Sequence, residues 1–556
     1  MAALRALFAR LKPRLGSAAE AALVSLQRQS RAASLLAGAM LLSAHLVAQT
    51  IPPPSTRIWH DDERALITDL TVVTAVAATR NVVYAAVPGA LAVYDRGFRT
   101  WKETIGALDG FPEDRITAMV ANPEDDTAWL AGSGEWVAWS PFGRRLDAGP
   151  LPGFSDAVVL DARDPSRGAY FHTAAGWYFV ARGALAAEPA RDLPAPNARV
   201  GGLTYAQLVA RAPALDAVRF RFQRDDHLRD YRLTAAAVAP LTNEIYVATD
   251  GNGVFEVDPL TYATTPLPKG ALGSAVGSVA VSRDEICSAS DARARSVRRG
   301  ITCFDESLHD MRYIEAAGLA GLPGTVTRRL LITQRAVWAA TDQGLLRADR
   351  RSDRVQQIGE REGLPGLDVY ALAPAPTGVW VGTSRGLALI ADTGRSLTVV
   401  RSITSGPVLA LLPAWDTLWA GTPAGLALLP PGGDALLLVD GPAPVHDPIV
   451  ALARHADTLV AATAARFIVH AGEWRVVDVP GRPIGTIIAM AEDATGLWVA
   501  GSEGFAFFDP SRPLWNALVA PGDVPHPVRD VVATRDHVWV ATDAGLVRYA
   551  RRALLP

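Results

Sequence analysis

The chain is poor in the residues and patterns that carry catalysis. Its 556 residues hold two Cys, and its ten His are scattered without the spacing of a metal-binding motif. No glycine-rich phosphate loop precedes a helix, and no serine lies in the strand-to-helix turn of a nucleophile elbow. We therefore expect no catalytic residues, no metal site and no cofactor.

A net positive charge is found only at the N-terminus. The formal net charge is −3, but residues 1–48 carry six Arg or Lys side chains and one Glu, so the remaining chain has a net charge of −8. Without a basic face, a nucleic-acid partner is excluded.

With 49% hydrophobic residues, the chain is long enough for a large core and exceeds one ordinary domain.

The N-terminus has the pattern of an export signal. A basic stretch ends at Arg31, residues 32–48 are uncharged and apolar, and Ile51-Pro52-Pro53-Pro54 ends any helix. Residues 1–48 are predicted to be a signal peptide or a membrane anchor with a short apolar helix. If uncleaved, residues 32–48 would anchor the protein in the inner membrane. We expect a bacterial protein of the periplasm or cell surface; a chain that is not exported is the third interpretation.

A strand-turn-strand pattern recurs at intervals of roughly 41 residues. The copy VWAATDQGLL begins at Val337, and similar copies begin at Val379, Leu418, Leu497 and Val538. Each copy is an apolar strand, a tight turn with Gly and a returning strand, and small residues typical of an inner strand lie about a dozen residues before it. Such a period predicts an all-β fold of β-propellers, in which small antiparallel sheets are arranged radially as blades.

Eleven hairpins are visible, and a twelfth would fit between Tyr170 and Tyr246. Since one ring usually holds four to eight blades, we expect tandem propellers of about twelve four-stranded blades, with about six in each ring. The first propeller is placed at residues 49–315 and the second at 316–556. A strand at residues 56–60, around Arg57-Ile58-Trp59, is expected to complete the last blade.

Residues 183–232 depart from the repeat. Thr204 and Gln207 have capping-box spacing, which predicts a short helix. The alternation in VRFRFQRDDHLRDYR from Val218 predicts a strand with one charged face. Two interpretations stay open for this region, a decayed blade with a helical insertion and a docking surface for a partner.

The two cysteines flank an insertion within one hairpin. Cys287 takes the Trp position of the first strand and Cys303 the position that Arg347 holds in the copy from Val337, so the two lie opposite each other. In an exported protein this spacing favours a disulfide across the insertion from Ser290, whose arginines we expect to resist burial. Two buried free thiols are the alternative.

The repeats resemble the two-component regulator propeller family. The fullest match is GLPGLDVYALAPAPTGVWVGTSRGLALI, from Gly363 to Ile390, and a second begins at Asp109. The resemblance implies propeller blades, and in that family such propellers are often the extracytoplasmic sensors of hybrid histidine kinases or parts of surface and secretion proteins. Because little sequence follows the last hairpin, a propeller without the kinase part is expected here.

The hairpin turn and the loop before the inner strand are expected to emerge on one face of each ring. Seven side chains are predicted to surround the openings: Arg115, Asp342, Asp368, Arg385, Glu503, Arg529 and Asp543. Mixed charges of this kind suit either a solvated surface or a polar partner. Trp136, Trp139 and Trp177 either face a glycan or pack between blades.

The predicted function is that of an exported, non-catalytic scaffold for binding, sensing or assembly, with another protein or a glycan as partner. Two alternatives are an extracytoplasmic sensor that works with a separate histidine kinase, and a propeller enzyme acting on polysaccharide.

Overall fold

The computed structural model describes residues 59–554, apart from 61, 113–114, 162, 193–202, 284, 292–297, 309–310, 316–325, 353, 480–482 and 512–513. The predicted signal or anchor at residues 1–48 therefore lies outside the described residues. Within them the fold is all-β, with eleven four-stranded antiparallel sheets. No helix among the described residues is long and apolar enough to cross a membrane.

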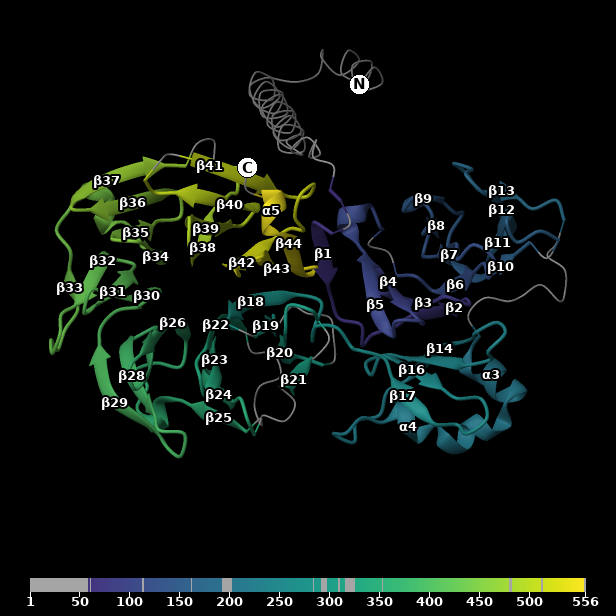
Figure 1. Ribbon diagram of the computed structural model, residues 1–556, viewed down its shortest axis with the longest axis horizontal. Helices are drawn as coiled ribbons and strands as arrows, with labels where there is room; N and C mark the ends of the chain where they lie inside the picture. The colour runs from purple at the N-terminus through teal and green to yellow at the C-terminus, as the bar shows by residue number, and fades with distance from the viewer. Residues whose placement is uncertain are drawn as a thin grey trace, which may run out of the picture. The chain divides into compact units, whose positions relative to one another are not determined.

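Four sheets come from the first half of the chain and are called here the N-terminal arc (Figure 1). Their strands are β2 (Ala75–Ala78), β3 (Val82–Val87), β4 (Ala90–Asp95) and β5 (Thr100–Ile105); β6 (Ala118–Ala121), β7 (Ala128–Ala131), β8 (Glu135–Ser140) and β9 (Arg145–Pro150); β10 (Ser155–Leu160), β11 (Gly168–Thr173), β12 (Gly176–Ala181) and β13 (Glu188–Pro189); β14 (Leu233–Val238), β15 (Ile245–Thr249), β16 (Val254–Val257) and β17 (Thr264–Pro266). The first strand of each sheet is innermost: β14 contacts β2, β2 contacts β6, and β6 contacts β10.

Seven sheets form what we call the C-terminal ring. Six of them contain, in order, β18 (Val276–Val281), β19 (Ile286–Ser290), β20 (Gly300–Phe304) and β21 (Arg312–Glu315); β22 (Thr327–Ile332), β23 (Ala336–Thr341), β24 (Gly344–Asp349) and β25 (Val355–Ile358); β26 (Val369–Ala375), β27 (Gly378–Thr383), β28 (Gly386–Asp392) and β29 (Leu397–Thr404); β30 (Ala410–Ala414), β31 (Thr417–Thr422), β32 (Gly425–Leu429) and β33 (Leu437–Leu438); β34 (Ala451–His455), β35 (Thr458–Ala462), β36 (Arg466–Ala471) and β37 (Glu473–Asp478); β38 (Ile487–Asp493), β39 (Gly496–Gly501), β40 (Gly504–Asp509) and β41 (Leu514–Val519). The seventh joins β42 (Val528–Ala533), β43 (His537–Thr542) and β44 (Gly545–Ala550) to β1 (Arg64–Ile67).

The innermost strands of the C-terminal ring contact one another in a closed succession. β18 contacts β22, and the contacts continue through β26, β30, β34, β38 and β42 back to β18. This is the arrangement of a β-propeller. The sheet of residues 276–315, which the repeat pattern assigned to the first propeller, packs here beside β22 and β42, so the change from arc to ring comes one sheet earlier than expected.

Strand β1 closes the last sheet, and it lies later in the sequence than predicted. Arg64 to Ile67 pair antiparallel with β44, from Tyr549 to Leu546. Trp59 is not in a strand; its ring lies 5.3 Å from that of Tyr549, and its Nε1 donates to Asp523 at 3.3 Å. Residues 56–58 lie outside the described residues. Trp59, from the predicted strand, therefore does pack on the last sheet, but the strand that closes the sheet is Arg64–Ile67 and not 56–60.

The repeat forms the predicted strands for clear physical reasons. Trp338, Trp498 and Trp539 of the hairpin strands are fully buried between sheets. Gly545 has a φ of 136°, and a Cβ there would lie 2.6 Å from the carbonyl oxygen of Ile67, so the turn requires glycine for both its backbone angle and its close approach to β1. The hairpins of Trp338, Trp498 and Trp539 thus each supply an aromatic side chain that fills the space between sheets, and the turn at Gly545 fits only glycine.

The aromatic residues that were open to a glycan interpretation mostly belong to the core. Trp136 and Trp139 are buried in two hydrophobic clusters of the N-terminal arc. Trp177 is half-buried, with its ring 4.8 Å from that of His172. These positions are those of side chains that pack the sheets.

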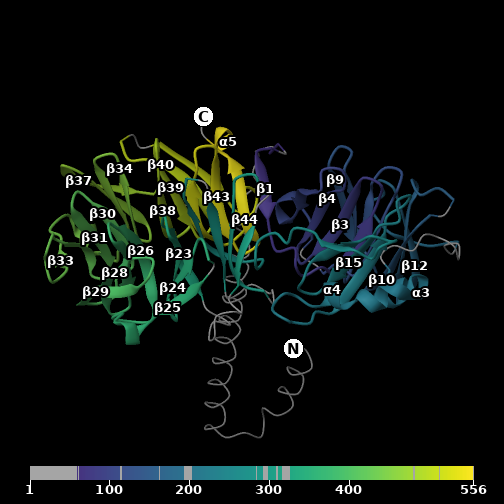
Figure 2. The same ribbon diagram turned by 60° about the horizontal axis from the view of Figure 1, so that its bottom comes forward.

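The gap between β13 and β14 holds helices. Helix α3 (Tyr205–Arg211) has the predicted capping box between Thr204 and Gln207, and it is followed by the 3₁₀ helix η3 (Pro213–Val218) and by α4 (Phe220–Gln223). α4 lies against β15 (Figure 2) and β17 (Figure 1). The strand predicted from Val218 is therefore wrong, and residues 203–232 form no twelfth blade.

The shorter 3₁₀ helices are η2 (Ala107–Asp109), η5 (Glu360–Glu362) and η6 (Ala443–His446), and α5 (Arg551–Leu554) ends the described chain.

The loop after α4 contains a charged cluster. Burial alone would raise the pKa of Asp225, but hydrogen bonds from Arg229 and from the Tyr231 hydroxyl lower the pKa to about 2. The Arg229 Nε donates to Asp225 at 2.7 Å and its Nη2 pairs with Glu315 of β21. Glu315 also pairs with Arg298, which is buried. The expectation that the arginines of the Cys-flanked insertion resist burial is therefore wrong for Arg298, because Glu315 compensates its charge.

The two cysteines form the predicted disulfide. Cys287 and Cys303 are directly opposite each other in the β19–β20 pairing, and their sulfurs are bonded. In the next sheet the same register places Trp338 opposite Arg347. Most of the insertion spanned by the disulfide, residues 292–297, lies outside the described residues.

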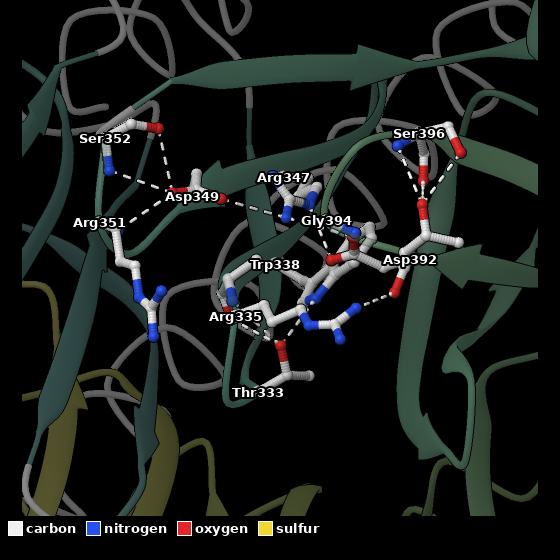
Figure 3. Close-up of polar contacts among 12 residues, drawn as sticks. Thr333, Arg335, Trp338, Arg347, Asp349, Arg351, Ser352, Asp392, Gly394 and Ser396 are labelled. Carbon is white, nitrogen blue, oxygen red and sulfur yellow. Dashed lines mark hydrogen bonds and ion pairs between the residues drawn. The ribbon is translucent and has the colours of Figure 1, made fainter.

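Arg347 is the centre of a polar cluster buried between two sheets (Figure 3). Its Nε donates to Asp392 at 2.9 Å and its Nη2 contacts Asp349 at 3.3 Å, while its guanidinium lies 5.9 Å from the centre of the Trp338 ring. Asp392 also accepts from the Gly394 N–H at 2.7 Å. Because these groups satisfy one another in the interior, the cluster is a structural link between β24 and β28.

Candidate functional site at the mouth of the C-terminal ring

Five of the seven inner strands of the C-terminal ring share an irregularity near their first residues. The register shifts by one residue near the start of β18, β22, β26, β38 and β42. The additional residues are Gly277, Arg328, Tyr370, Ile488 and Arg529. A bulge turns the side chain of its extra residue away from the regular alternation. We call the end of the ring where these bulges lie the mouth.

The first polar group at the mouth joins two neighbouring inner strands. Arg328 Nη1 donates to Asp368 Oδ1 at 2.6 Å, and the Tyr370 hydroxyl donates to Asp368 Oδ2 at 2.8 Å. The Arg328 guanidinium lies 4.9 Å from the centre of the Tyr370 ring. The hydrogen bond to Asp368 is the main reason that the pKa of Tyr370 is raised. All three side chains are half-buried, so they are ordered and still reach solvent.

The second polar group is a bidentate ion pair between Arg529 and Asp543. Arg529 Nε and Nη2 each donate to one carboxylate oxygen of Asp543 at 2.9 Å. Arg529 is the bulge residue of β42, and Asp543 lies in the turn after β43. The hydrogen bonds to Asp543 raise the pKa of the Arg529 guanidinium, with burial opposing them and Asp291 adding to the rise. The fork-to-carboxylate geometry fixes both groups in one orientation.

A buried network holds the mouth together from below. Asp530 Oδ2 accepts from the Ser278 hydroxyl at 2.7 Å and from the Val279 N–H at 3.2 Å. Arg329 lies 3.4 Å from Asp530 Oδ1 and donates to the Ile488 carbonyl oxygen at 3.0 Å. The network therefore connects inner strands β18, β22, β38 and β42, and it keeps the bulged residues above it in place.

The predicted side chains are only partly brought together. Asp368, Arg529 and Asp543 form the two groups just described. Asp342 accepts from the Val326 N–H at 3.1 Å and lies in the turn after β23. The other two on the ring are at exposed hairpin turns, with Arg385 paired to Glu360 and Glu503 lying 3.1 Å from His526.

Arg115 does not belong to this set. It is exposed and precedes β6 of the N-terminal arc, whereas the other six residues lie on the C-terminal ring. The grouping of all seven around the openings therefore divides into six residues on one ring and one on the arc.

Arg328 and Tyr370 were missed in the sequence, although a signal for them exists. Each is the second residue of its inner strand, as Arg529 is. Aligning the inner strands by their first residue would have placed all three at one structural position. The turn-based reasoning instead selected residues next to them.

The mouth offers fixed hydrogen-bonding groups of both signs. Its guanidinium groups are donors and its carboxylates are acceptors, and each charge is already partly neutralised by its neighbour. Such a surface recognises a polar ligand by directed hydrogen bonds, with little attraction at long range.

No known family model matches the chain. No curated protein matches it in sequence. Among solved structures it is similar to PorZ of Porphyromonas gingivalis, described as an essential bacterial surface component of the type-IX secretion system. The TM-score is 0.55 at 10% identity, over 88% of this chain and 87% of PorZ. That likeness supports the fold.

Two weaker likenesses accompany it. One is to the extracellular domain of a putative one-component system of B. thetaiotaomicron, with a TM-score of 0.41 and 12% identity over 86% of this chain and 70% of that one. The other is to virginiamycin B lyase of Staphylococcus aureus, with a TM-score of 0.41 and 14% identity over 50% of this chain and 96% of that one.

Proposed function

We propose that this protein is an exported, non-catalytic binding scaffold that holds another protein or a glycan at the mouth of its C-terminal ring. The observation that carries the proposal is the pair of ordered ion pairs, Arg328 with Asp368 and Arg529 with Asp543, on bulged positions of the inner strands. Bulges next to a functional site commonly redirect a side chain towards a ligand. The fold shared with PorZ, a surface component, supports an extracytoplasmic location and an assembly role.

The energetics favour binding over stability as the role of these pairs. Both pairs are half-buried and still reach solvent, and fully exposed ion pairs contribute about 0–1 kcal/mol to folding. A charged hydrogen bond to a ligand contributes about 1.5–3 kcal/mol, because a ligand that excludes water strengthens it. The same side chains thus matter little to the fold and much to a partner.

The test compares two variants of the full chain in partner recovery and on a glycan array. Arg328→Ala combined with Arg529→Ala removes both mouth guanidinium groups, and Arg395→Ala removes an exposed arginine from the turn after β28, at the opposite end of its sheet. We expect the double variant to lose about tenfold or more in affinity. The control should bind as the parent does, and both should melt within a few degrees of it. Equal binding by the double variant would move the site away from the mouth.

A further inference from the structure

Four exposed apolar side chains occupy the same structural position in the four sheets of the N-terminal arc. Each lies in the turn between the third and fourth strands: Phe98, Phe142, Leu185 and Leu260. Their exposed fractions are between 84% and 88%. In the described residues of the corresponding turns of the C-terminal ring, no large apolar side chain is exposed. We call these four residues the tips.

The turn geometry does not require an apolar residue. Asp95 Oδ1 accepts from the Phe98 N–H at 2.9 Å, and Asp258 Oδ1 accepts from the Leu260 N–H at 2.9 Å. The C-terminal ring uses the same device at Asp349, which accepts from the Ser352 N–H at 3.0 Å. Turns built on the same kind of Asp hydrogen bond therefore carry apolar residues on the arc, at Phe98 and Leu260, and a polar one on the ring, at Ser352, so the turn geometry does not explain the difference.

All four tips lie on one face of the arc. In a four-stranded meander the first and third turns are at one end of the sheet and the second turn at the other, and the inner strands of the arc follow one another side by side. Leu241, also exposed, is in the first turn of the sheet that contains Leu260 and therefore belongs to the same face. Arg96, in the turn of Phe98, joins that turn to the turn of Leu241, because its Nη2 donates to Thr242 at 2.8 Å.

Arginines lie beside the tips with their charges outward. Four ion pairs on this face are Arg99 with Glu256, Arg144 with Glu103, Arg145 with Asp147, and Arg182 with Asp125. In every pair the arginine is the more exposed partner, with 34–59% of its side chain accessible against 14–28% for the carboxylates. In these four pairs the arginine is therefore the outer group, although the pairs are nearly neutral and the same face also carries the exposed carboxylate of Glu124. Arg96, which is mostly buried, is the exception.

A hollow between two of the tips adds a polar recess to this face. The cavity has a volume of about 430 Å³ and lies between the turn after β8 and the turn after β12. Trp129 and Phe142 supply its aromatic wall, and Arg145 and Arg182 supply guanidinium groups. Asp147 also lines the cavity and pairs with Arg145 at 2.9 Å. Its size and its lining suit the phosphate-bearing headgroup of a lipid better than an apolar ligand.

We propose that the tip face of the N-terminal arc docks on the surface of an anionic membrane. Single apolar side chains that protrude from separate turns have no common groove between them, so a rigid protein partner would need a matching pocket for each. A lipid interface accepts all four at once, because acyl chains deform around each tip. The outward arginines then meet lipid phosphates, which is the arrangement of interfacial binding. The inference is independent of what binds at the mouth.

The experiment follows insertion at single sites of the full chain. Both native cysteines are in the disulfide, so Phe142→Cys, Leu260→Cys or Thr393→Cys each provides one thiol for the fluorophore NBD. Thr393 lies in the third turn of a sheet of the C-terminal ring and is the matched control. Each labelled protein is mixed with vesicles of phosphatidylethanolamine and phosphatidylglycerol that contain lipids brominated in the acyl chain, which quench NBD only at insertion depth.

We expect quenching at both tips and none at position 393. A membrane segment near the N-terminus would hold all three proteins on the vesicles equally, so it cannot produce this difference. In the Leu260→Cys protein, adding Phe98→Ser, Phe142→Ser and Leu185→Ser should lower the quenched fraction about tenfold or more. Replacing phosphatidylglycerol by phosphatidylcholine should weaken it as well.

Three outcomes would overturn the proposal. The first is no quenching at either tip, and the second is equal quenching at position 393. The third is quenching that survives the triple serine substitution in a protein with an unchanged melting temperature. Protection of the tips from solvent by a soluble protein, without vesicles, would assign the face to that partner instead.

Discussion

Replacing Asp392 by Ala should destabilise the C-terminal ring strongly, because it leaves a buried guanidinium without its main partner. Arg347 has 3% of its side chain exposed and Asp392 has 6%. Breaking a buried ion pair from one side costs about 3–5 kcal/mol. Asp349 still lies 3.3 Å from Arg347, so the lower end of that range, about 3 kcal/mol, is expected.

The second variant of the pair replaces the other partner, as Arg347→Leu. Leucine is the suitable replacement because it occupies the same position in the next two sheets. Leu389 stands opposite Trp380 there and Leu428 opposite Trp419. Combining Arg347→Leu with Asp392→Ala removes both charges and should cost about 1 kcal/mol, since a well-packed apolar replacement of a buried pair is close to neutral. Arg347→Leu alone leaves Asp392 buried without its main partner and is therefore also destabilising, so the coupling energy of the double-mutant cycle should be at least roughly 2 kcal/mol.

The suitable assay is native-state hydrogen exchange of β24 and β28, read by mass spectrometry as the free energy of opening. A chain with eleven sheets need not unfold in one step, so a local probe is more informative than a single melting temperature. If Asp392→Ala opened as easily as the parent, or if the cycle gave no coupling, the cluster in Figure 3 would not link the two sheets.

Three further outcomes are expected from stability measurements. Replacing Cys287 and Cys303 by Ser should lower the free energy of unfolding by roughly 3 kcal/mol, since the disulfide joins residues 16 apart, and dithiothreitol should do the same to the parent protein. Leu66→Ala should cost about 3 kcal/mol and open β44 first in hydrogen exchange, because Leu66 is buried on the closing strand. The folded pKa of Asp225, about 2, is below its unfolded value, so its contribution is present above pH 4 and is lost as the pH falls towards 2; denaturant titrations of Asp225→Asn should lack that loss.

Much of the local structure could be predicted because the repeat encodes it. The position of Cys287 and Cys303 in the hairpin pattern was enough to place them opposite each other, since antiparallel register follows from turn length. Thr204 and Gln207 were enough to start α3, because a capping box acts within one turn.

The strand expected from Val218 shows where alternation misleads. Phe222 is fully buried and its ring lies 6.1 Å from that of Tyr205 and 6.3 Å from that of Phe255, whereas Phe220 is exposed. Packing against α3 and β16 thus favours a helical turn here over the two-residue alternation. Tertiary contacts of this kind are invisible in the segment itself.

The sequence could not show which sheets belong to the N-terminal arc and which to the C-terminal ring. The repeats are similar to one another, so a repeat does not show which sheets it packs against. Ser278 bonds to Asp530, 252 residues later, and this contact assigns the sheet of β18 to the C-terminal ring. The closing strand posed the same difficulty, since four residues, Arg64 to Ile67, carry little pattern of their own. Some of the mouth residues were found because the hairpin turns and the loops before the inner strands can be recognised in the sequence. Arg529 was found in this way, whereas Arg328 was missed because the bulge that exposes it cannot be recognised in the sequence.

Site-specific photo-crosslinking in the cells that produce the protein can show whether the mouth of the C-terminal ring holds the partner. A photo-reactive residue is placed at Arg385 or at Glu503, both exposed at the mouth, and at Asp457, an exposed residue of the turn between β34 and β35 at the opposite end. If the partner binds at the mouth, both mouth positions should give one cross-linked species, which should be absent at Asp457 and lost when Arg328 and Arg529 are replaced by Ala. The same species from Asp457, or no species from either mouth position, would contradict it.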